Sequence, residues 1–447
     1  MTPSSEDKEI RTLLDSFPRF RMDEHKQREI AEHIYHVKES LARMKRRKQH
    51  RKWIGGIVIS FAFVLIVYQL VIPLLSSSVP IAQRMIEEEV LRATSIETHE
   101  KKAETVLTID PQIQAYVDEA LQKANALYHP ENMTVIVSDP NTGEILAIGN
   151  HNPEAIDDKK QADAVRAMPS PVAAFPVVTL AAAIQEGKFN PTEIYESGTY
   201  EIAPGELIKD HNNGIGWGKI PYLEGIQRSS NVAFAKLGSE RLQGDVLQEY
   251  LERFGFGQKT AIELTDEEAG QIPNLGNARE VAVAAMGQAG SASAIQQVAA
   301  IGAIANGGKL LRPHINKKPE SKKNHEYYVR QVISEETARK VRDILESVVH
   351  SQFGADKTFV INNYPVAGKS GISPKYDQQG KVMDNKQIFS FIGFAPSNNP
   401  KLLVYVAVDG PKIEPPVGLA WRKVVSPLFR EVMENSLQHL QQQKPVD

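Results

Sequence analysis

One uncharged apolar run, residues 53–75, restricts what this chain can fold into more than any other feature of the sequence. As a helix, the run is long enough to cross a hydrocarbon core of about 30 Å. A basic segment, residues 45–52, lies directly before it, and such Lys and Arg clusters stay on the cytoplasmic side of a membrane. The long polar segment that precedes the run is not typical of a cleaved signal peptide. We therefore expect a single-pass protein of the cell membrane, with a cytoplasmic N-terminus and a large extracellular part.

The segments on either side of this span differ in composition. Residues 1–52 are expected to form a cytoplasmic tail, in which one helical stripe would carry Ile30, Ile34, Val37, Leu41 and Met44. The stripe is typical of a helix that lies on a membrane or on itself, and a short coiled coil with a partner is the alternative. Residues 76–104 are expected to form a stalk and linker, and residues 105–447 a globular domain.

Charge and residue types exclude several classes of function. The formal net charge of -3 gives no reason to expect binding to nucleic acid. The chain has no cysteine, which excludes disulfides and thiol catalysis. Its histidines show no spacing typical of a metal site, and we expect neither a metal nor a cofactor.

The pattern after residue 105 predicts an α+β domain, in which helices pack on one antiparallel sheet. A helix begins at Pro111 with Asp110 as its cap. The pattern then gives an early hairpin (residues 133–139 and 145–149) and central helices (ending near 187, then 223–241, 245–254, 281–306 with an interruption at 287–290, and 335–349). Late strands (366–371, 388–394 and 401–408) and a final helix (421–440) complete the domain.

Residues 169–183 combine a proline-marked turn with an apolar, alanine-rich helix. A turn that delivers its first helical residue into a cleft, with free backbone N–H groups, is how serine acyl-transferases present a nucleophile. Here the position for the hydroxyl is Ala173. One turn later, where a Ser-x-x-Lys motif has its lysine, the residue is Pro176.

From about Thr105 to Pro411 the chain resembles the transpeptidase domain of class B penicillin-binding proteins. The landmarks occur in the family's order: Thr108-Ile-Asp110 with Gln114, residues 139–147, Ser229-Ser-Asn231 on a helix, residues 254–257, residues 287–308, Gly368-Lys-Ser-Gly371 and residues 391–396. Each landmark alone is weak, and their order and spacing carry the resemblance.

The resemblance implies that three elements line one cleft, as they do in this family. The serine of Ser-x-x-Lys attacks the D-Ala-D-Ala carbonyl and its lysine takes the proton, Ser-x-Asn relays protons, and Lys-Thr/Ser-Gly binds the substrate carboxylate. This chain keeps a vestigial substrate-binding set: Ser229, Asn231, Lys369, Ser370 and Gly371. Ala173 and Pro176 replace the first element, and Ile372 replaces the hydroxyl residue that usually follows the glycine.

These replacements leave no catalytic residue at the expected positions. Removing a catalytic serine elsewhere lowers turnover by a factor on the order of 10⁶, and Pro176 removes the base as well. Ser170 is a poor substitute, because it lies three residues before Ala173 and has Ala173 itself where its lysine should be. A proline in the first helical turn costs little, so we expect a well-folded pseudoenzyme.

The expected function is therefore that of a non-catalytic scaffold or regulator in peptidoglycan synthesis. Its expected partners are cell-envelope or wall-synthesis proteins, with weak binding of peptidoglycan stem peptides or β-lactams at most. Two alternatives stay open. One is an active D,D-transpeptidase or carboxypeptidase with an unrecognised nucleophile, and the other is a sensor of β-lactams or muropeptides.

Overall fold

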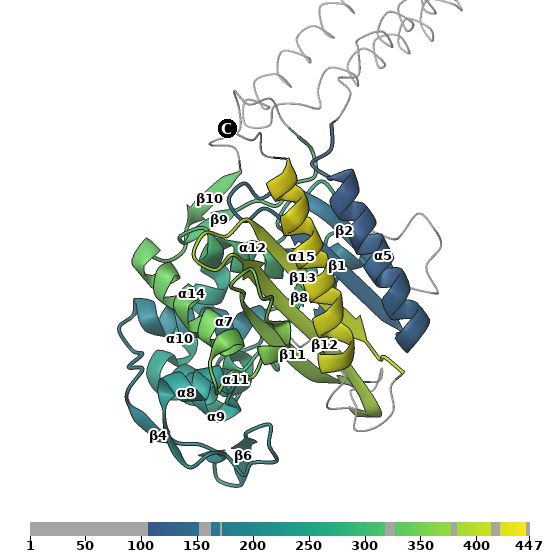
Figure 1. The fold of residues 1–447 in the computed structure, drawn as a ribbon. Helices are drawn as coiled ribbons and strands as arrows, with labels where there is room; N and C mark the ends of the chain where they lie inside the picture. The colour runs from purple at the N-terminus through teal and green to yellow at the C-terminus, as the bar shows by residue number, and fades with distance from the viewer. Residues whose placement is uncertain are drawn as a thin grey trace, which may run out of the picture. The chain divides into compact units, whose positions relative to one another are not determined.

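The computed structural model of this protein describes residues 106–151, 162–169, 172–317, 327–376, 382–412 and 421–443 (Figure 1). These residues belong to one compact unit, Ala103–Asp447. The expected cytoplasmic tail, membrane span and stalk lie outside the described residues. Within the described ranges, the helices are all too short or too polar to cross a membrane.

An antiparallel sheet of five strands forms the centre of the domain, in the order β11-β12-β13-β1-β2. The strands are β1 (Asn132–Ser138), β2 (Ile145–His151), β11 (Ala367–Tyr376), β12 (Val382–Ala395) and β13 (Leu402–Asp409). The early hairpin joins the late strands through β1 and β13, whose register runs from Asn132 opposite Asp409 to Ser138 opposite Leu403. The predicted α+β architecture with one antiparallel sheet is confirmed.

Two terminal helices cover one face of this sheet: α5 (Pro111–Tyr128) and α15 (Ser426–Gln442) (Figure 1). The carboxylate of Asp110 caps α5, because it accepts the N–H groups of Gln112 and Ile113 at 2.9 and 3.0 Å. Pro111 follows as the first helical residue, as predicted. Apolar side chains of both helices pack against β1, β12 and β13 in one buried cluster.

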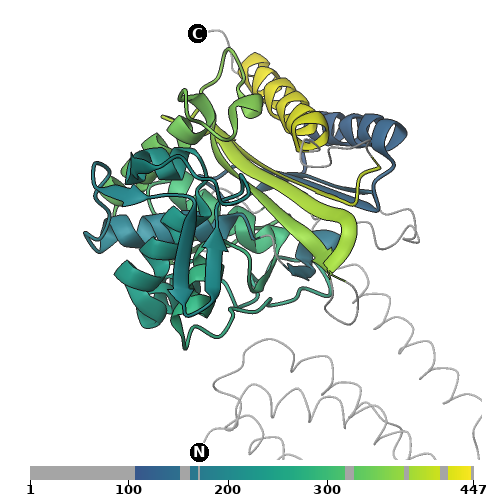
Figure 2. The same ribbon diagram turned by 90° about the horizontal axis from the view of Figure 1, so that it is seen from below.

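The other face of the sheet carries the larger helical part, opposite α5 and α15 (Figure 2). Its helices are α6 (Ala162–Val165), α7 (Ala174–Gln185), α8 (Tyr222–Gln227), α9 (Asn231–Lys236), α10 (Gln243–Arg253), α11 (Ala278–Ala285), α12 (Ala294–Ala305) and α14 (Glu335–His350). Short strands pair around them: β3 (Ala167–Pro169) with β8 (Ser291–Ser293), β4 (Ile194–Glu196) with β7 (Lys219–Pro221), β5 (Thr199–Ala203) with β6 (Glu206–Lys209), and β9 (Lys309–Leu311) with β10 (Tyr328–Gln331). Helix α7 is buried along most of its length.

One predicted helix is wrong. The sequence pattern gives a continuous helix over residues 223–241, with Ser229-Ser-Asn231 inside it. In the structure α8 ends before Ser229, whose φ of 56° is left-handed, and α9 begins at Asn231. Ser230 caps the new helix by accepting the N–H of Ala233 at 3.1 Å. A π-helical turn, Leu237–Leu242, then continues α9 toward α10.

Candidate functional site

The turn before α7 places Ala173 immediately in front of the helix, with only 2% of its surface exposed. Pro176 is the third residue of α7 and therefore lies in the first turn, as predicted. The N–H of Val172 donates to the carbonyl of Gly287 at 3.1 Å. Gly287 has a φ of +76°, and a Cβ atom there would lie 2.9 Å from Cδ of Pro176. The proline ring thus packs closely on the backbone at Gly287.

Gln297 connects the start of α7 to the sheet, and the sequence patterns did not single it out. Its buried side chain accepts the N–H of Ala174 at 3.4 Å and donates to the hydroxyl of Tyr405 at 3.5 Å. Burial raises the pKa of Tyr405, so that its hydroxyl stays neutral. Gln297 thereby links the start of α7 to Tyr405 of β13 through two long hydrogen bonds.

The bend that carries Ser229 and Asn231 is held by a buried carboxylate. Oδ1 of Asp210 accepts the hydroxyl of Ser230 at 2.8 Å and the N–H of Val232 at 3.1 Å. Its Oδ2 accepts the N–H of Gly198 at 2.7 Å. The Asn231 side chain donates to the carbonyl of Lys209 at 2.8 Å, directly before Asp210. The end of β6 therefore positions the Ser-x-Asn segment.

The Lys-Ser-Gly segment lies on β11, which is the edge strand of the five-stranded sheet. The side chain of Lys369 is almost completely buried, and its Nζ donates to the carbonyl of Ser370 at 2.7 Å. Burial lowers the pKa of Lys369, and the nearby carboxylate of Asp356 opposes that shift. A cation that is desolvated in this way needs an anion close to it.

Asp356 is the carboxyl group that acts on Lys369. It follows α14 in a loop, is completely buried, and accepts the backbone N–H of Ser370 at 3.0 Å. Burial raises the pKa of Asp356, while the charge of Lys369 and a hydrogen bond with the Ser370 side chain act in the opposite direction. The neighbouring N–H of Ala355 donates to the carbonyl of Gln227 at 2.9 Å, at the end of α8. This loop therefore connects the Ser-x-Asn and Lys-Ser-Gly segments.

Comparison with known proteins assigns the family. A model of the penicillin binding protein transpeptidase domain matches residues 133–434, which is more than half of the chain. The chain belongs to this family. Stage V sporulation protein D of Bacillus subtilis is 38% identical over 353 residues, 75% of this chain and 53% of that protein. The chain thus spans about half the length of this Bacillus relative. A probable peptidoglycan D,D-transpeptidase PenA of Neisseria flavescens is 30% identical over 344 residues, 74% of this chain and 82% of that protein.

Solved structures agree with this assignment. The transpeptidase domain of penicillin-binding protein 3 from Burkholderia pseudomallei has a TM-score of 0.66 at 27% identity, and the match covers 76% of this chain and 97% of that chain. Penicillin-binding protein 3 of Mycobacterium tuberculosis, solved with ampicillin, has a TM-score of 0.63 at 26% identity, with 77% of this chain and 80% of that chain covered. The resemblance to class B penicillin-binding proteins is confirmed.

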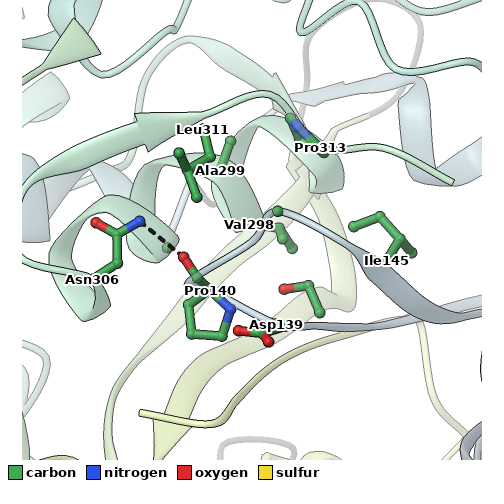
Figure 3. Close-up of a pocket in the computed structure, with 11 residues that line it drawn as sticks. Asp139, Pro140, Ile145, Val298, Ala299, Asn306, Leu311 and Pro313 are labelled. Carbon is green, nitrogen blue, oxygen red and sulfur yellow. Dashed lines mark hydrogen bonds between the residues drawn. The ribbon is translucent and has the colours of Figure 1, made fainter. Parts of the chain in front are cut away.

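Several landmarks of the penicillin-binding protein family have structural contacts in this chain. Asp139, Pro140 and Asn306 line a small pocket between the β1–β2 turn and α12, where the Asn306 amide donates to the carbonyl of Pro140 at 2.8 Å (Figure 3). Gln114 of α5 accepts the N–H of Ile148 at 3.0 Å and donates to its carbonyl at 3.0 Å. These residues join helices to the hairpin β1–β2.

The structure brings Ser370 and Lys369 together with Asp356, and it connects that loop to the bend at Ser229. The prediction that Ala173 faces Ser229, Asn231 and Lys369 across one cleft stays a prediction. Asp210, Gln297 and Asp356 belong to the site and were not predicted. Among the described residues, no group of His, Asp and Glu side chains could hold a metal ion.

Proposed function

We propose that this protein is a membrane-anchored, catalytically inactive member of the penicillin-binding protein family. The observation that carries the proposal is the pair Ala173 and Pro176 at the start of α7, in a chain whose residues 133–434 match the transpeptidase domain. Alanine has no atom that can attack a carbonyl, and proline has no amine that can accept a proton. The loss therefore removes the nucleophile and its base together.

The surroundings of these two residues support this proposal. Ala173 is buried, and the carbonyl of Val172 before it accepts the N–H of Phe175 at 3.0 Å. Pro176 fills its space beside Gly287 with an apolar ring. An amine at this site would be buried in an apolar cluster, since α7 contributes almost all of its residues to the core. Nothing in this packing requires the missing hydroxyl or ammonium group.

We propose that the protein acts in peptidoglycan synthesis through contacts with cell-envelope or wall-synthesis proteins. In this proposal residues 53–75 anchor it in the membrane, and residues 105–447 lie outside the cell. The family assignment supports the link to the cell wall, because one relative is named a probable peptidoglycan D,D-transpeptidase. The Bacillus relative is named for stage V of sporulation, which makes spore formation one setting in which to look for partners.

Labelling with a fluorescent penicillin tests the loss of catalysis. Membranes that contain the full-length protein are incubated with the label, boiled in detergent and separated on a gel. We expect no labelled band at the size of this protein, while active penicillin-binding proteins in the same membranes are labelled. A boil-resistant band at its size would show acylation and would favour an active D,D-transpeptidase.

Restoring the motif provides the matched comparison. Ala173→Ser alone should stay unlabelled, because Pro176 supplies no base for the new hydroxyl. If restoring the motif produces any labelling, we expect it in the double variant Ala173→Ser, Pro176→Lys. Strong labelling of Ala173→Ser alone would mean that another group serves as the base, and the proposed loss of two functions would then be wrong.

A further inference from the structure

We propose that the carboxylate of Asp356 occupies, from within the chain, the place where this cleft would hold the carboxylate of a ligand. Two neighbouring residues act on this one side chain. The backbone N–H of Ser370 donates to Oδ2 at 3.0 Å, and the positive charge of Lys369 favours the ionised carboxylate. The residue has no solvent-exposed surface.

These groups are the ones that a carboxylate ligand requires. β11 is paired on one side only, with β12. The N–H of Ser370 points away from β12, since it donates to Asp356. An outward N–H donates a hydrogen bond to the anion, and a buried ammonium nearby adds an attractive field. A peptide or β-lactam carboxylate that entered here would meet the same donors.

The loop holds Asp356 in this position from both sides. The N–H of Asp356 donates to the carbonyl of Val348 at 3.2 Å, and its carbonyl accepts the N–H of Phe359 at 3.0 Å. Gly354 makes a close approach possible, because a Cβ atom there would lie 2.5 Å from the carbonyl oxygen of Val348. The ring of Phe353 lies beneath the guanidinium of Arg228, 4.5 Å from its centroid. The backbone contacts of this loop therefore fix the position of the Asp356 carboxylate.

Burial acts most strongly on the pKa of Asp356 and raises it, whereas His211 acts in the opposite direction. The second oxygen, Oδ1, has no hydrogen-bond partner among the described residues. A ligand carboxylate would have to displace Asp356 from Ser370 and leave it buried without partners, or approach a buried like charge. Both are unfavourable, so the site excludes anions.

This inference deepens the proposed function, because it gives the cleft a second reason not to bind stem peptides or β-lactams. It depends on the contacts of Asp356 and not on Ala173 or Pro176. Its test measures the binding of acetate, whereas the proposed function is tested by acylation. A negative result in one test therefore does not contradict the other proposal.

The experiment is a chemical rescue of stability. The full-length protein in detergent micelles is unfolded thermally in increasing sodium acetate, with sodium chloride added to keep the ionic strength constant. Wild type should show no effect specific to acetate, because its own carboxylate fills the site. Asp356→Ala should unfold at a lower temperature and recover stability with acetate. At acetate ten times its dissociation constant, the folding equilibrium should shift about 11-fold, or about 1.4 kcal/mol.

Two further variants control for this effect. Asp356→Asn keeps the shape of the side chain, so it should leave no room for acetate and show no rescue. Asp356→Ala combined with Lys369→Met removes the cation, and this double variant should lose most of the response to acetate. A response that is equal in Asp356→Ala and Asp356→Asn would overturn the proposal, and so would a folded Asp356→Ala that ignores acetate.

If Asp356→Ala does not fold in chloride, its refolding yield is measured in acetate. Recovery of folded protein in acetate supports the proposal. Failure in both salts contradicts it, because an open site with an outward N–H and a nearby ammonium group would then have no measurable affinity for a carboxylate.

Discussion

Replacing Gly287 by alanine should destabilise the turn that carries Ala173. Gly287 has a φ of +76°, and the left-handed conformation costs an L-residue about 1–2 kcal/mol. The new Cβ atom would lie 2.6 Å from the carbonyl oxygen of Val172 and 2.9 Å from Cδ of Pro176. Overpacking of this kind adds about 1–3 kcal/mol, so we expect a total loss of about 2–5 kcal/mol.

Gly187 provides a matched control at the other end of α7. Its φ is +64°, and a Cβ atom there would meet no heavy atom within 4 Å. Gly187→Ala should therefore lose only the conformational part, about 1–2 kcal/mol. A second comparison adds Pro176→Ala to Gly287→Ala. This removes the contact with the ring and should restore part of the difference, whereas the contact with Val172 remains.

Urea unfolding of the Ala103–Asp447 domain measures these differences, with tryptophan fluorescence as the signal and equal slopes as the condition for comparison. The result that would refute the reasoning is a Gly287→Ala variant within about 0.5 kcal/mol of Gly187→Ala. In that case the turn at Ala173 would not depend on close packing against Gly287, and Pro176 would be free to shift.

Three other predictions follow from the structure and the sequence. Burial raises the pKa of Asp110, but hydrogen bonds from Ile113, His439 and Gln112 outweigh it and lower the net value. The stabilisation by Asp110 should be present above the unfolded pKa of about 3.9 and should be lost as the pH falls through the lower folded value. The destabilisation of about 1 kcal/mol in Asp110→Ala should therefore vanish in thermal unfolding at acid pH. Protease added to intact wall-less cells should digest residues 105–447 and spare residues 1–52, and a protected domain would reverse the topology. Calorimetry with benzylpenicillin or D-Ala-D-Ala should give no heat, or a Kd no tighter than about millimolar, roughly -4 kcal/mol, and a micromolar, Lys369-dependent affinity would favour a ligand sensor.

The order of the secondary structure was predictable because its signals are local. Asp110 and Pro111 mark the start of α5, and the alternating apolar runs mark the hairpin β1–β2. The break at Ser229 was not predictable in this way. The apolar pattern continues through it, and the group that holds the bend, Asp210, is 20 residues away from Ser230 in the sequence. The helical spacing of apolar residues carries no information about a carboxylate on another element.

The same distinction between local and long-range signals applies to the residues of the candidate site. Ala173, Pro176 and Lys369 could be named because motif spacing fixes their positions. Gln297 and Asp356 could not, since each acts through a contact with a distant segment. Asp356 has only a weak local signal in the sequence. It is a charged residue two positions after Gly354, in the loop that follows the amphipathic helix α14. Such a residue is far more often exposed than completely buried.

Together, the two proposals would account for a transpeptidase-like domain that folds without catalytic chemistry. A catalytic lysine at position 176 would be a buried cation, and burying a charge costs several kcal/mol unless a partner compensates it. Pro176 avoids that cost and packs on Gly287. Lys369 remains as the second buried cation, and Asp356 compensates it in place of a ligand. At position 176 the proline avoids a buried charge, and at Lys369 the proposed placement of Asp356 offsets one. In the proposed arrangement the charges of the cleft are compensated from within, so a bound stem peptide would add no further compensation.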